Sequence, residues 1–193
     1  MGKIVISENV TLDGVIQDPT GEEGFRFGGW FGQIGDKDRE AWAKVEFEEA
    51  LGTEALLLGR RTYEWFVARG WASRGGDWPD RLRSLPKYVV SSTLEDLEWN
   101  NSTILNGDAV NEVSKLRERL KGEIVVPASL HLVHTLIEND LVDELRLMIF
   151  PFVLGSGKRL FHETSDKLPL RLVTNRTVGD GLPYVIYEIV RAA

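Results

Sequence analysis

Short runs of apolar, often β-branched residues alternate with helix-like segments along the first two thirds of the chain. The helix-like segments span residues 36–51 and 110–120, where apolar positions recur three or four residues apart. Asp108 stands at the N-cap position of the second helix, and Gly122 follows its end. A third helix is expected after Ser129, which can cap it. The apolar runs predict strands over residues 3–7, 55–59, 87–91 and 123–126.

The pattern changes after residue 140, where residues 144–150 alternate and place Leu145, Leu147 and Ile149 on one side. Strands are predicted over 144–150, 170–178 and 184–190, with the turn-rich stretch 179–183 between the last two. Strand–helix units followed by successive strands predict a three-layer α/β fold, with a mixed sheet of about eight strands and helices on both faces. We expect a single domain over residues 1–193, with a long Gly-rich loop at 21–35.

Composition narrows the classes of function. The 193 residues contain no cysteine, which excludes disulfides, thiolate catalysis and Cys-ligated metals. His131 and His134 are spaced for one helix face but lack a third ligand nearby, so no metal is expected. The net charge of −7 argues against nucleic-acid binding. No apolar run is long enough for a membrane span or a signal segment, so we expect no membrane association and a cytoplasmic protein.

Three predicted strands end in residues suited to a phosphorylated ligand. The first end, Gly59-Arg60-Arg61-Thr62, runs from a strand into a helix and combines free backbone N–H groups with two guanidinium groups. A solvated basic turn is the alternative interpretation of this segment. The second end carries Ser91 and Ser92, whose hydroxyls suit a ribose or phosphate or belong to an ordinary turn.

The third strand end is Pro127-Ala128-Ser129, again leading into a helix. Small residues there would allow a pyrophosphate to approach the helix N-terminus. Taken alone this signal is weak. Three such ends on one sheet make a stronger prediction than any one of them.

Several blocks together resemble a known family. They are Thr11-Leu12-Asp13-Gly14, the segment 59–64, the segment 141–147, and Leu154-Gly155-Ser156-Gly157-Lys158 after Pro151. In this order they resemble the dihydrofolate-reductase-like superfamily, and within it the C-terminal reductase domain of the bifunctional riboflavin-biosynthesis deaminase/reductase. The resemblance covers nearly the whole chain. It implies NADPH as hydride donor, a small-molecule substrate and a homodimer.

The resemblance also implies roles for single residues. Gly59, Arg60, Arg61 and Thr62 match the turn that holds the cofactor's phosphates, and Ser91 and Ser92 match the pair near the adenosine 2′-phosphate. Ala128 and Ser129 match the positions that approach the cofactor, and Ile16 falls in the segment that lies against the nicotinamide. Asp13 matches the aspartate of the substrate pocket and is our candidate for orienting substrate or relaying a proton. Trp30, in a loop, is a candidate for contacting a flat substrate ring.

One departure concerns the third strand end, where the riboflavin-pathway reductases have Glu-Gly-Gly and this chain has Pro127-Ala128-Ser129. Loss of the Glu argues against the riboflavin-pathway pyrimidine as substrate. We expect Ala128 to admit a pyrophosphate if its φ is negative. We therefore predict an NADPH-dependent reductase of a small heterocycle, similar to 5-amino-6-(5-phosphoribosylamino)uracil reductase. Dihydrofolate reduction, which would need a carboxylate near Asp38 or Glu40, and a non-catalytic nucleotide-binding module are the alternatives.

Overall fold

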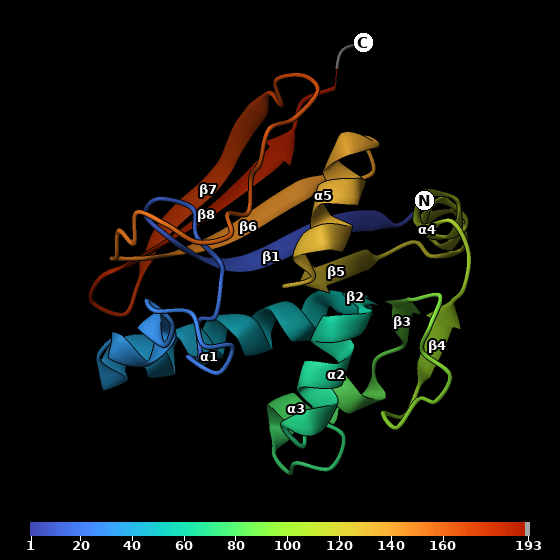
Figure 1. Ribbon diagram of the computed structural model, residues 1–193, viewed down its shortest axis with the longest axis horizontal. Coiled ribbons are helices and arrows are strands. Elements are labelled where there is room, and N and C mark those ends of the chain that lie inside the picture. The colour runs from blue at the N-terminus through green and yellow to red at the C-terminus, as the bar shows by residue number, and fades with distance from the viewer. Residues whose placement is uncertain (192–193) are drawn as a thin grey trace. The chain divides into compact units, whose positions relative to one another are not determined.

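The computed structural model describes residues 1–191 and shows eight strands and five α-helices among them (Figure 1). In chain order the elements are β1 (Lys3–Thr11), the 3-10 helix η1 (Trp30–Gln33), α1 (Asp36–Gly52), β2 (Thr53–Gly59), α2 (Arg60–Ala68), α3 (Asp77–Ser84), β3 (Lys87–Val90), β4 (Ser102–Leu105), α4 (Ala109–Arg119), β5 (Glu123–Pro127), α5 (Leu130–Glu138), β6 (Glu144–Phe150), β7 (Leu170–Val178) and β8 (Leu182–Ile189).

The strands form one mixed sheet in the order β4-β3-β2-β5-β1-β6-β8-β7. β4, β3, β2 and β5 pair in parallel, whereas β6, β8 and β7 pair antiparallel. This confirms the predicted mixed α/β sheet of about eight strands. Three elements were not predicted: the 3-10 helix η1, the strand β4 and the helix α3. β1 also extends four residues beyond the predicted end at residue 7. No helix of the described residues is long and apolar enough to cross a membrane.

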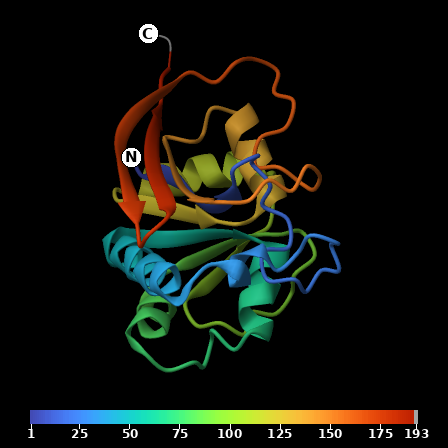
Figure 2. The same ribbon diagram turned by 90° about the vertical axis from the view of Figure 1, so that its left-hand side faces the viewer.

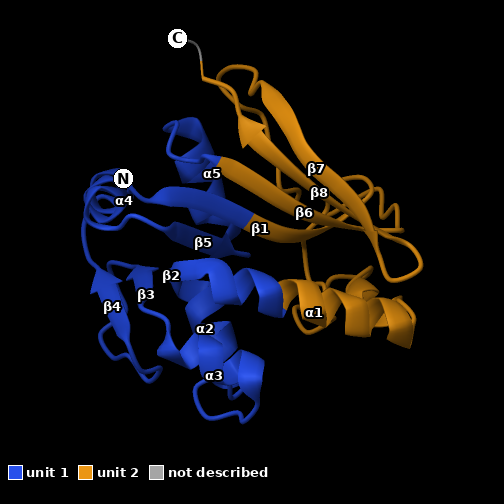
Figure 3. Ribbon diagram, turned by 180° about the vertical axis from the view of Figure 1, so that it is seen from behind, with its two compact units in different colours: residues 1–6, 47–143 blue, residues 7–46, 144–193 orange. Residues whose placement is uncertain are grey.

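Each of two compact units is built from separate stretches of the chain (Figure 3). Unit 1 comprises residues 1–6 and 47–143, and unit 2 comprises residues 7–46 and 144 onward. The chain passes from one unit to the other three times, and the expectation of a single domain remains a prediction.

Unit 1 has its helices on both faces of the parallel strands, with α4 and α5 on one side and α2 and α3 on the other (Figures 1 and 2). Beneath α2 and α3 lies a core rich in aromatic rings. The ring centroids of Phe66 and Trp99 are 5.4 Å apart, and those of Trp71 and Trp78 are 5.1 Å apart. Buried aliphatic side chains from β2 and β3 complete this core.

Unit 2 contains the antiparallel strands, and Figure 2 shows β7 and β8 as a long hairpin. Its core packs the buried rings of Trp30 and Phe150 edge to face, with centroids 5.1 Å apart. β7 is the edge strand, and all of its side chains except Val178 are exposed.

Asp143, in the block 141–147, has a structural role within unit 1. The Asp143 carboxylate accepts a hydrogen bond from the Ile4 N–H at 2.8 Å and from the Arg117 guanidinium at 2.5 Å. Arg117 also donates to the Gly2 carbonyl at 3.0 Å. Both side chains of this ion pair are 13% exposed, so the pair is shielded and fixes the start of β1.

Lys87, the first residue of β3, is fully buried. Its ammonium donates to the carbonyls of Leu82, Arg83 and Leu85 at 2.7–3.1 Å and lies 4.6 Å from the centroid of the Trp99 ring. The carbonyls belong to the end of α3 and the residue after it, where a cation is favoured. Burial, and secondarily the charge of Arg83, lowers the pKa of Lys87 from 10.5 to about 8.

This shift predicts how stability depends on pH. Between pH 8 and 10.5 the unfolded chain binds a proton at Lys87 that the folded chain has released, so the free energy of unfolding rises with pH through this window. Wild-type protein should therefore gain on the order of 1–2 kcal/mol relative to Lys87→Met as the pH is raised across that range. Urea unfolding of both proteins at several pH values measures the difference. A difference that stays constant or shrinks with pH would contradict the assignment.

Candidate functional site

Three strand ends meet at one edge of unit 1. β3, β2 and β5 are adjacent and parallel, so Ser91, Gly59 and Ala128, which end or directly follow these strands, share the carboxyl edge. α2 starts directly after β2, and α5 starts three residues after β5 ends at Pro127. Two nine-residue helices thus present their unpaired first-turn N–H groups near this edge.

Ser129 joins the two helix starts. Its hydroxyl oxygen accepts a hydrogen bond from the Gly59 N–H at 3.0 Å and its hydroxyl donates to the Pro127 carbonyl at 3.1 Å. Its own N–H donates to Thr62 Oγ1 at 3.0 Å, and its carbonyl accepts from the Val133 N–H at 2.9 Å. Every polar group of Ser129 is therefore hydrogen-bonded. We call this set of bonds the Ser129 brace.

The backbone at the brace is left-handed at two successive residues. Ala128 has φ 49° and Ser129 has φ 60°. The condition set above for Ala128, a negative φ, is therefore not met. Each non-glycine residue in this region costs about 1–2 kcal/mol, and such residues persist only where the surroundings hold them. Ser129 is the N-cap residue of α5, as expected, but its hydroxyl makes no capping bond to the helix and bonds Gly59 and Pro127 instead.

The positive charges expected at this edge are exposed. Arg60 lies 3.6 Å from the Glu64 carboxylate, one helical turn along α2. Arg61 is exposed and makes no ion pair with any described residue. Both follow the start of α2, where the helix dipole adds to their attraction for an anion.

The two serines after β3 differ. The Ser91 hydroxyl oxygen accepts from the N–H groups of Thr93 and Leu94 at 3.2 and 3.0 Å, so it shapes the turn. Ser92 is exposed, and its hydroxyl has no partner among residues 1–191. Of the pair, Ser92 is the one free to bind a ligand.

The turn at Gly59 gives a test of whether a phosphorylated cofactor fits. Gly59 has φ −78°, which any residue adopts, and a Cβ added there would come no closer than 3.7 Å to Ser129. Neither backbone conformation nor packing within the chain requires glycine at this position. The turn is therefore open to the close approach of a ligand group, as a dinucleotide phosphate needs.

Unit 1 has a depression of about 610 Å³ between α2 and the segment after β3. Tyr63, Val67 and Leu94 contribute apolar surface, while the carboxylates are those of Glu64, Glu95, Asp96 and Glu98. No cation lines it. A phosphate is not expected there, and the sequence pattern had not indicated it.

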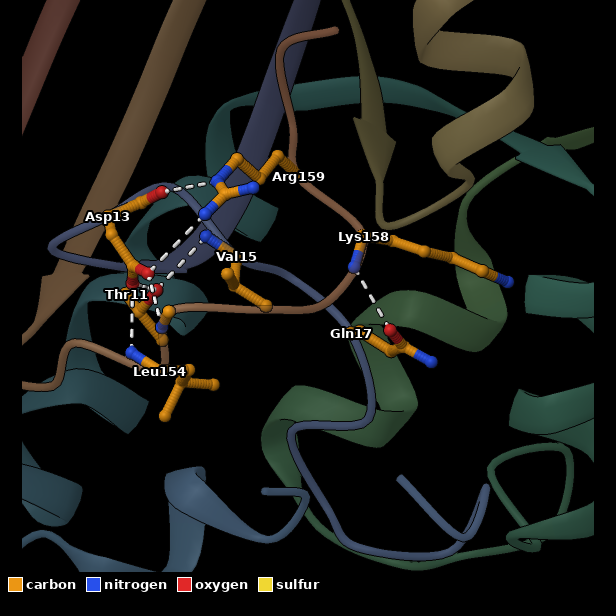
Figure 4. Close-up of polar contacts among 8 residues, drawn as sticks. Thr11, Asp13, Val15, Gln17, Leu154, Lys158 and Arg159 are labelled. Carbon is orange, nitrogen blue, oxygen red and sulfur yellow. Dashed lines mark hydrogen bonds and ion pairs between the residues drawn. The ribbon is translucent and has the colours of Figure 1, made fainter. Parts of the chain in front are cut away.

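Asp13, in unit 2, is held by neighbours on three sides (Figure 4). Its carboxylate accepts from the Thr11 hydroxyl at 2.7 Å and from the N–H groups of Leu154 and Gly155 at 3.2 and 2.9 Å. Arg159 donates to the Asp13 carbonyl and lies 3.8 Å from its carboxylate. The Thr11 hydroxyl and the two N–H groups lower the pKa of Asp13 below its usual 3.8. The carboxylate is thus ionised at neutral pH and fastens the 154–155 turn.

The other two predicted residues of unit 2 lie in different surroundings. Ile16 is half-buried, and its N–H donates to the Lys158 carbonyl at 3.0 Å. Trp30 is 1% exposed, and its indole N–H donates to the Gln17 carbonyl at 3.0 Å. Its burial in the core of unit 2 supports a packing role.

Asp18 organises the loop at 17–29, although sequence reasoning did not single it out. It is 2% exposed, and its carboxylate accepts from the N–H groups of Glu22, Glu23 and Phe25 at 2.7–3.1 Å. A Cβ at Gly28 would overlap this carboxylate, so the loop needs glycine there. The Asp-Pro-Thr-Gly sequence at 18–21 was the available turn signal.

The two carboxylates considered for dihydrofolate reduction, Asp38 and Glu40, are not placed for that role. Asp38 accepts hydrogen bonds from the N–H groups of Asp180 and Gly181 and so caps the β7–β8 turn. Glu40 is exposed. In addition, no cluster of three or more potential metal ligands occurs within the described part of the chain.

Comparison with known proteins agrees with this architecture. The chain is 30% identical to the uncharacterized protein YyaP of Bacillus subtilis (strain 168), over 96% of this chain and 94% of that one. The fold is similar to that of a presumed riboflavin biosynthesis protein from Shewanella sp. PV-4, with a TM-score of 0.71, 19% identity and coverage of 98% and 99% of the two chains.

The fold is also similar to that of the Enterococcus faecalis dihydrofolate reductase complexed with NADP(H) and RAB-propyl. That pair has a TM-score of 0.60 and 16% identity, over 98% of each chain. These similarities establish the dihydrofolate-reductase-like fold. The family model of the RibD C-terminal domain matches residues 2–184, and the chain therefore belongs to that family.

Proposed function

We propose that this protein binds NADPH through unit 1 and reduces a small heterocyclic metabolite. The observation that carries the proposal is the Ser129 brace, which ties the starts of α2 and α5 together at the carboxyl edge of the parallel strands. Membership of the RibD C-terminal domain family supports a reductase-type fold, and the similar dihydrofolate reductase was solved with NADP(H).

The cofactor would be held by the residues of the three strand ends. The unpaired N–H groups in the first turns of α2 and α5 suit the pyrophosphate, because helix N-termini bind anions. Gly59, Thr62, Ala128 and Ser129 shape the two turns that lead into these helices. Arg61 and Ser92, whose side chains are exposed, suit the 2′-phosphate. Arg60 adds charge beside them, and Ser91 shapes the turn that carries Ser92. When bound, NADPH supplies the hydride.

The substrate would be a planar ring with an electron-poor C=N or carbonyl carbon. The proposal keeps Asp13 as the residue that orients it, and Ile16 as the residue that the resemblance places against the nicotinamide. An ionised Asp13 is a hydrogen-bond acceptor at neutral pH, so the proton would come from another donor. Pro127 offers no carboxylate where the riboflavin-pathway reductases have Glu, which disfavours their pyrimidine substrate.

Turnover of NADPH tests the proposal. Wild-type protein should consume NADPH with an oxidant from a panel of pterins, flavins and related heterocycles, and react poorly with the riboflavin-pathway pyrimidine. Asp13→Asn keeps the shape but removes the charge, so it should lower turnover at least about tenfold while the Kd for NADPH changes less than about twofold. Absorbance of the reduced nicotinamide gives the rates, and calorimetry gives the Kd.

Each part of this test has its own contrary result. Binding of NADPH without turnover on any oxidant would favour the non-catalytic module. Efficient turnover of the riboflavin-pathway pyrimidine would refute the argument from Pro127, and full activity in Asp13→Asn would remove Asp13 from the site.

Preference for the phosphorylated cofactor is a separate prediction. Wild-type protein should bind NADPH at least about tenfold more tightly than NADH, since hydrogen bonds to a charged group contribute about 1.5–3 kcal/mol. Arg61→Gln should reduce this preference about tenfold. Arg171→Gln serves as the control, because Arg171 lies on β7 and pairs with Glu188 on β8, away from the three strand ends. Equal affinities of the wild type for the two cofactors, measured by calorimetry, would exclude the assigned 2′-phosphate contacts.

We also propose that the protein forms a homodimer. The apolar side chains of β6 are already covered by their own chain, with Leu145 at 0% and Leu147 at 9% exposure. The uncovered element is instead β7, whose Leu170, Leu172 and Val173 are 39–50% exposed on an edge strand. Exposed apolar edges of this kind invite pairing with a second chain.

Light scattering should give twice the chain mass of 21.8 kDa at micromolar concentrations. Val173→Lys should shift the protein towards the monomer, because it places a charge on the exposed edge. Leu51→Lys, at an equally exposed apolar position in α1, should leave the mass unchanged. A wild-type mass near that of one chain would count against the dimer.

A further inference from the structure

Asn9, on β1, is the residue from which we draw a further inference, and this inference rests on the proposed function. We infer that Asn9 determines which ring the protein accepts as substrate. Its side-chain amide donates a hydrogen bond to a carbonyl oxygen of the heterocycle, and the flat face of that ring lies against the indole of Trp42. Both residues belong to unit 2.

Asn9 occupies an unusual position for its residue type. β1 lies between β5 and β6 within the sheet, and its end was predicted at residue 7 because the residues that follow are polar. Asparagine is disfavoured in strands, and a half-buried amide costs free energy unless its polar atoms find partners. A polar side chain at such a position therefore calls for a structural or a functional reason.

The indole of Trp42 provides a structural reason for only half of that amide. Its N–H donates to Asn9 Oδ1 at 2.8 Å. An indole nitrogen can only donate, so the amide oxygen must face it, and the NH2 group of Asn9 is turned away from the indole nitrogen. That NH2 group has no hydrogen-bond partner within residues 1–191. Trp42 thus fixes the orientation of Asn9 and leaves two N–H donors available to a ligand.

Aromatic rings next to Asn9 offer a surface for a flat ligand. The rings of Trp42 and Phe31 meet edge to face with centroids 4.7 Å apart, and Phe31 lies 5.5 Å from Phe150. Phe150 is fully buried, whereas Phe31 and Trp42 are only half-buried and keep uncovered ring surface. The ring contact first considered for the buried Trp30 is therefore better met by Trp42.

Asn9 also lies close along the strand to the residues that hold Asp13. Side chains alternate along a strand, so Asn9 shares one face of β1 with Thr11. The Thr11 hydroxyl donates to the Asp13 carboxylate at 2.7 Å (Figure 4). Asp13 accepts hydrogen bonds and Asn9 donates them, so the two are complementary. A ring that has an N–H and a carbonyl oxygen on its edge would be held at two points, and therefore in one orientation.

The experiment measures the Kd of two probes by calorimetry, with and without NADPH. Quinazoline-2,4-dione carries carbonyl oxygens at the positions where quinazoline-2,4-diamine carries amino groups. Asn9→Asp keeps an oxygen for Trp42 but replaces the NH2 group by a second oxygen. It should weaken binding of the dione at least about tenfold, equivalent to about 1.4 kcal/mol, and leave binding of the diamine as tight or tighter. The Kd for NADPH should change less than about twofold.

Trp42→Phe tests how the amide is oriented. This variant keeps an aromatic ring but removes the N–H that faces Asn9, so the amide can rotate and present its oxygen. The ratio of the two dissociation constants should therefore shift at least about threefold towards the diamine. A purely structural effect would weaken both probes equally. Asn100→Asp is the matched control, because it makes the same chemical change at an exposed residue of unit 1 and should leave both dissociation constants unchanged.

The outcomes separate the inference from the proposed function. If the wild type turns over NADPH with an oxidant, and Asn9→Asp alters neither the KM for that oxidant nor the Kd of the dione, only the inference is overturned. Failure of the wild type to bind the dione, or an equal loss of both probes in Asn9→Asp, would overturn it as well. If the wild type neither binds nor oxidises NADPH but Asn9→Asp loses the dione selectively, the proposed function fails and the donor role of Asn9 holds. Should Asn9→Asp not fold, the ratio measured for Trp42→Phe decides.

Discussion

Parallel pairing of β3, β2 and β5 is the constraint on which the candidate site depends. Because parallel strands all run one way, their carboxyl ends must lie at one edge of the sheet. Segments that are 30 to 70 residues apart in the chain therefore meet there as Ser91, Gly59 and Ser129. Helices that start at these ends have first-turn N–H groups without an intrahelical partner. Side chains or a ligand must supply the hydrogen-bond acceptors for these groups. At these ends the N–H of Gly59 is bonded by the Ser129 hydroxyl, and the N–H of Ser129 is bonded by Thr62.

Much of the fold could be predicted because its signals are local. The strands at 144–150 and 170–178 were predicted with the observed bounds. Alternation is visible in the sequence of the first, and the turn-rich stretch 179–183 marks the end of the second. β4 has only four residues, two of them polar, and α3 contains a proline and few apolar positions, so neither has a periodic pattern. Burial of Lys87 depends on carbonyls at the end of that unpredicted helix.

At the candidate site the residue types were predictable, but their conformations were not. A small residue after β5 was expected, yet the positive φ of Ala128 follows from what Ser129 bonds. Those partners belong to β2 and α2, so the sequence around residues 128 and 129 does not indicate them. Asp13 is similar, because two of the N–H groups that its carboxylate accepts from belong to a turn about 140 residues away. Local pattern thus identified candidates, and tertiary hydrogen bonds decided what each candidate does.

The place of β1 in the sheet has a consequence for the order of events during synthesis. β1 is made before the other seven strands of this sheet, but its neighbours are β5 and β6, which begin at residues 123 and 144. Its apolar residues Ile4, Val5 and Ile6, fully buried in the finished protein, therefore wait for more than a hundred further residues to be translated. Pairing over such sequence separations is slow, and unpaired apolar strands are prone to aggregate. A nascent chain of this protein thus has an early and long-lasting need for protection, which ends only when β5 and β6 have emerged.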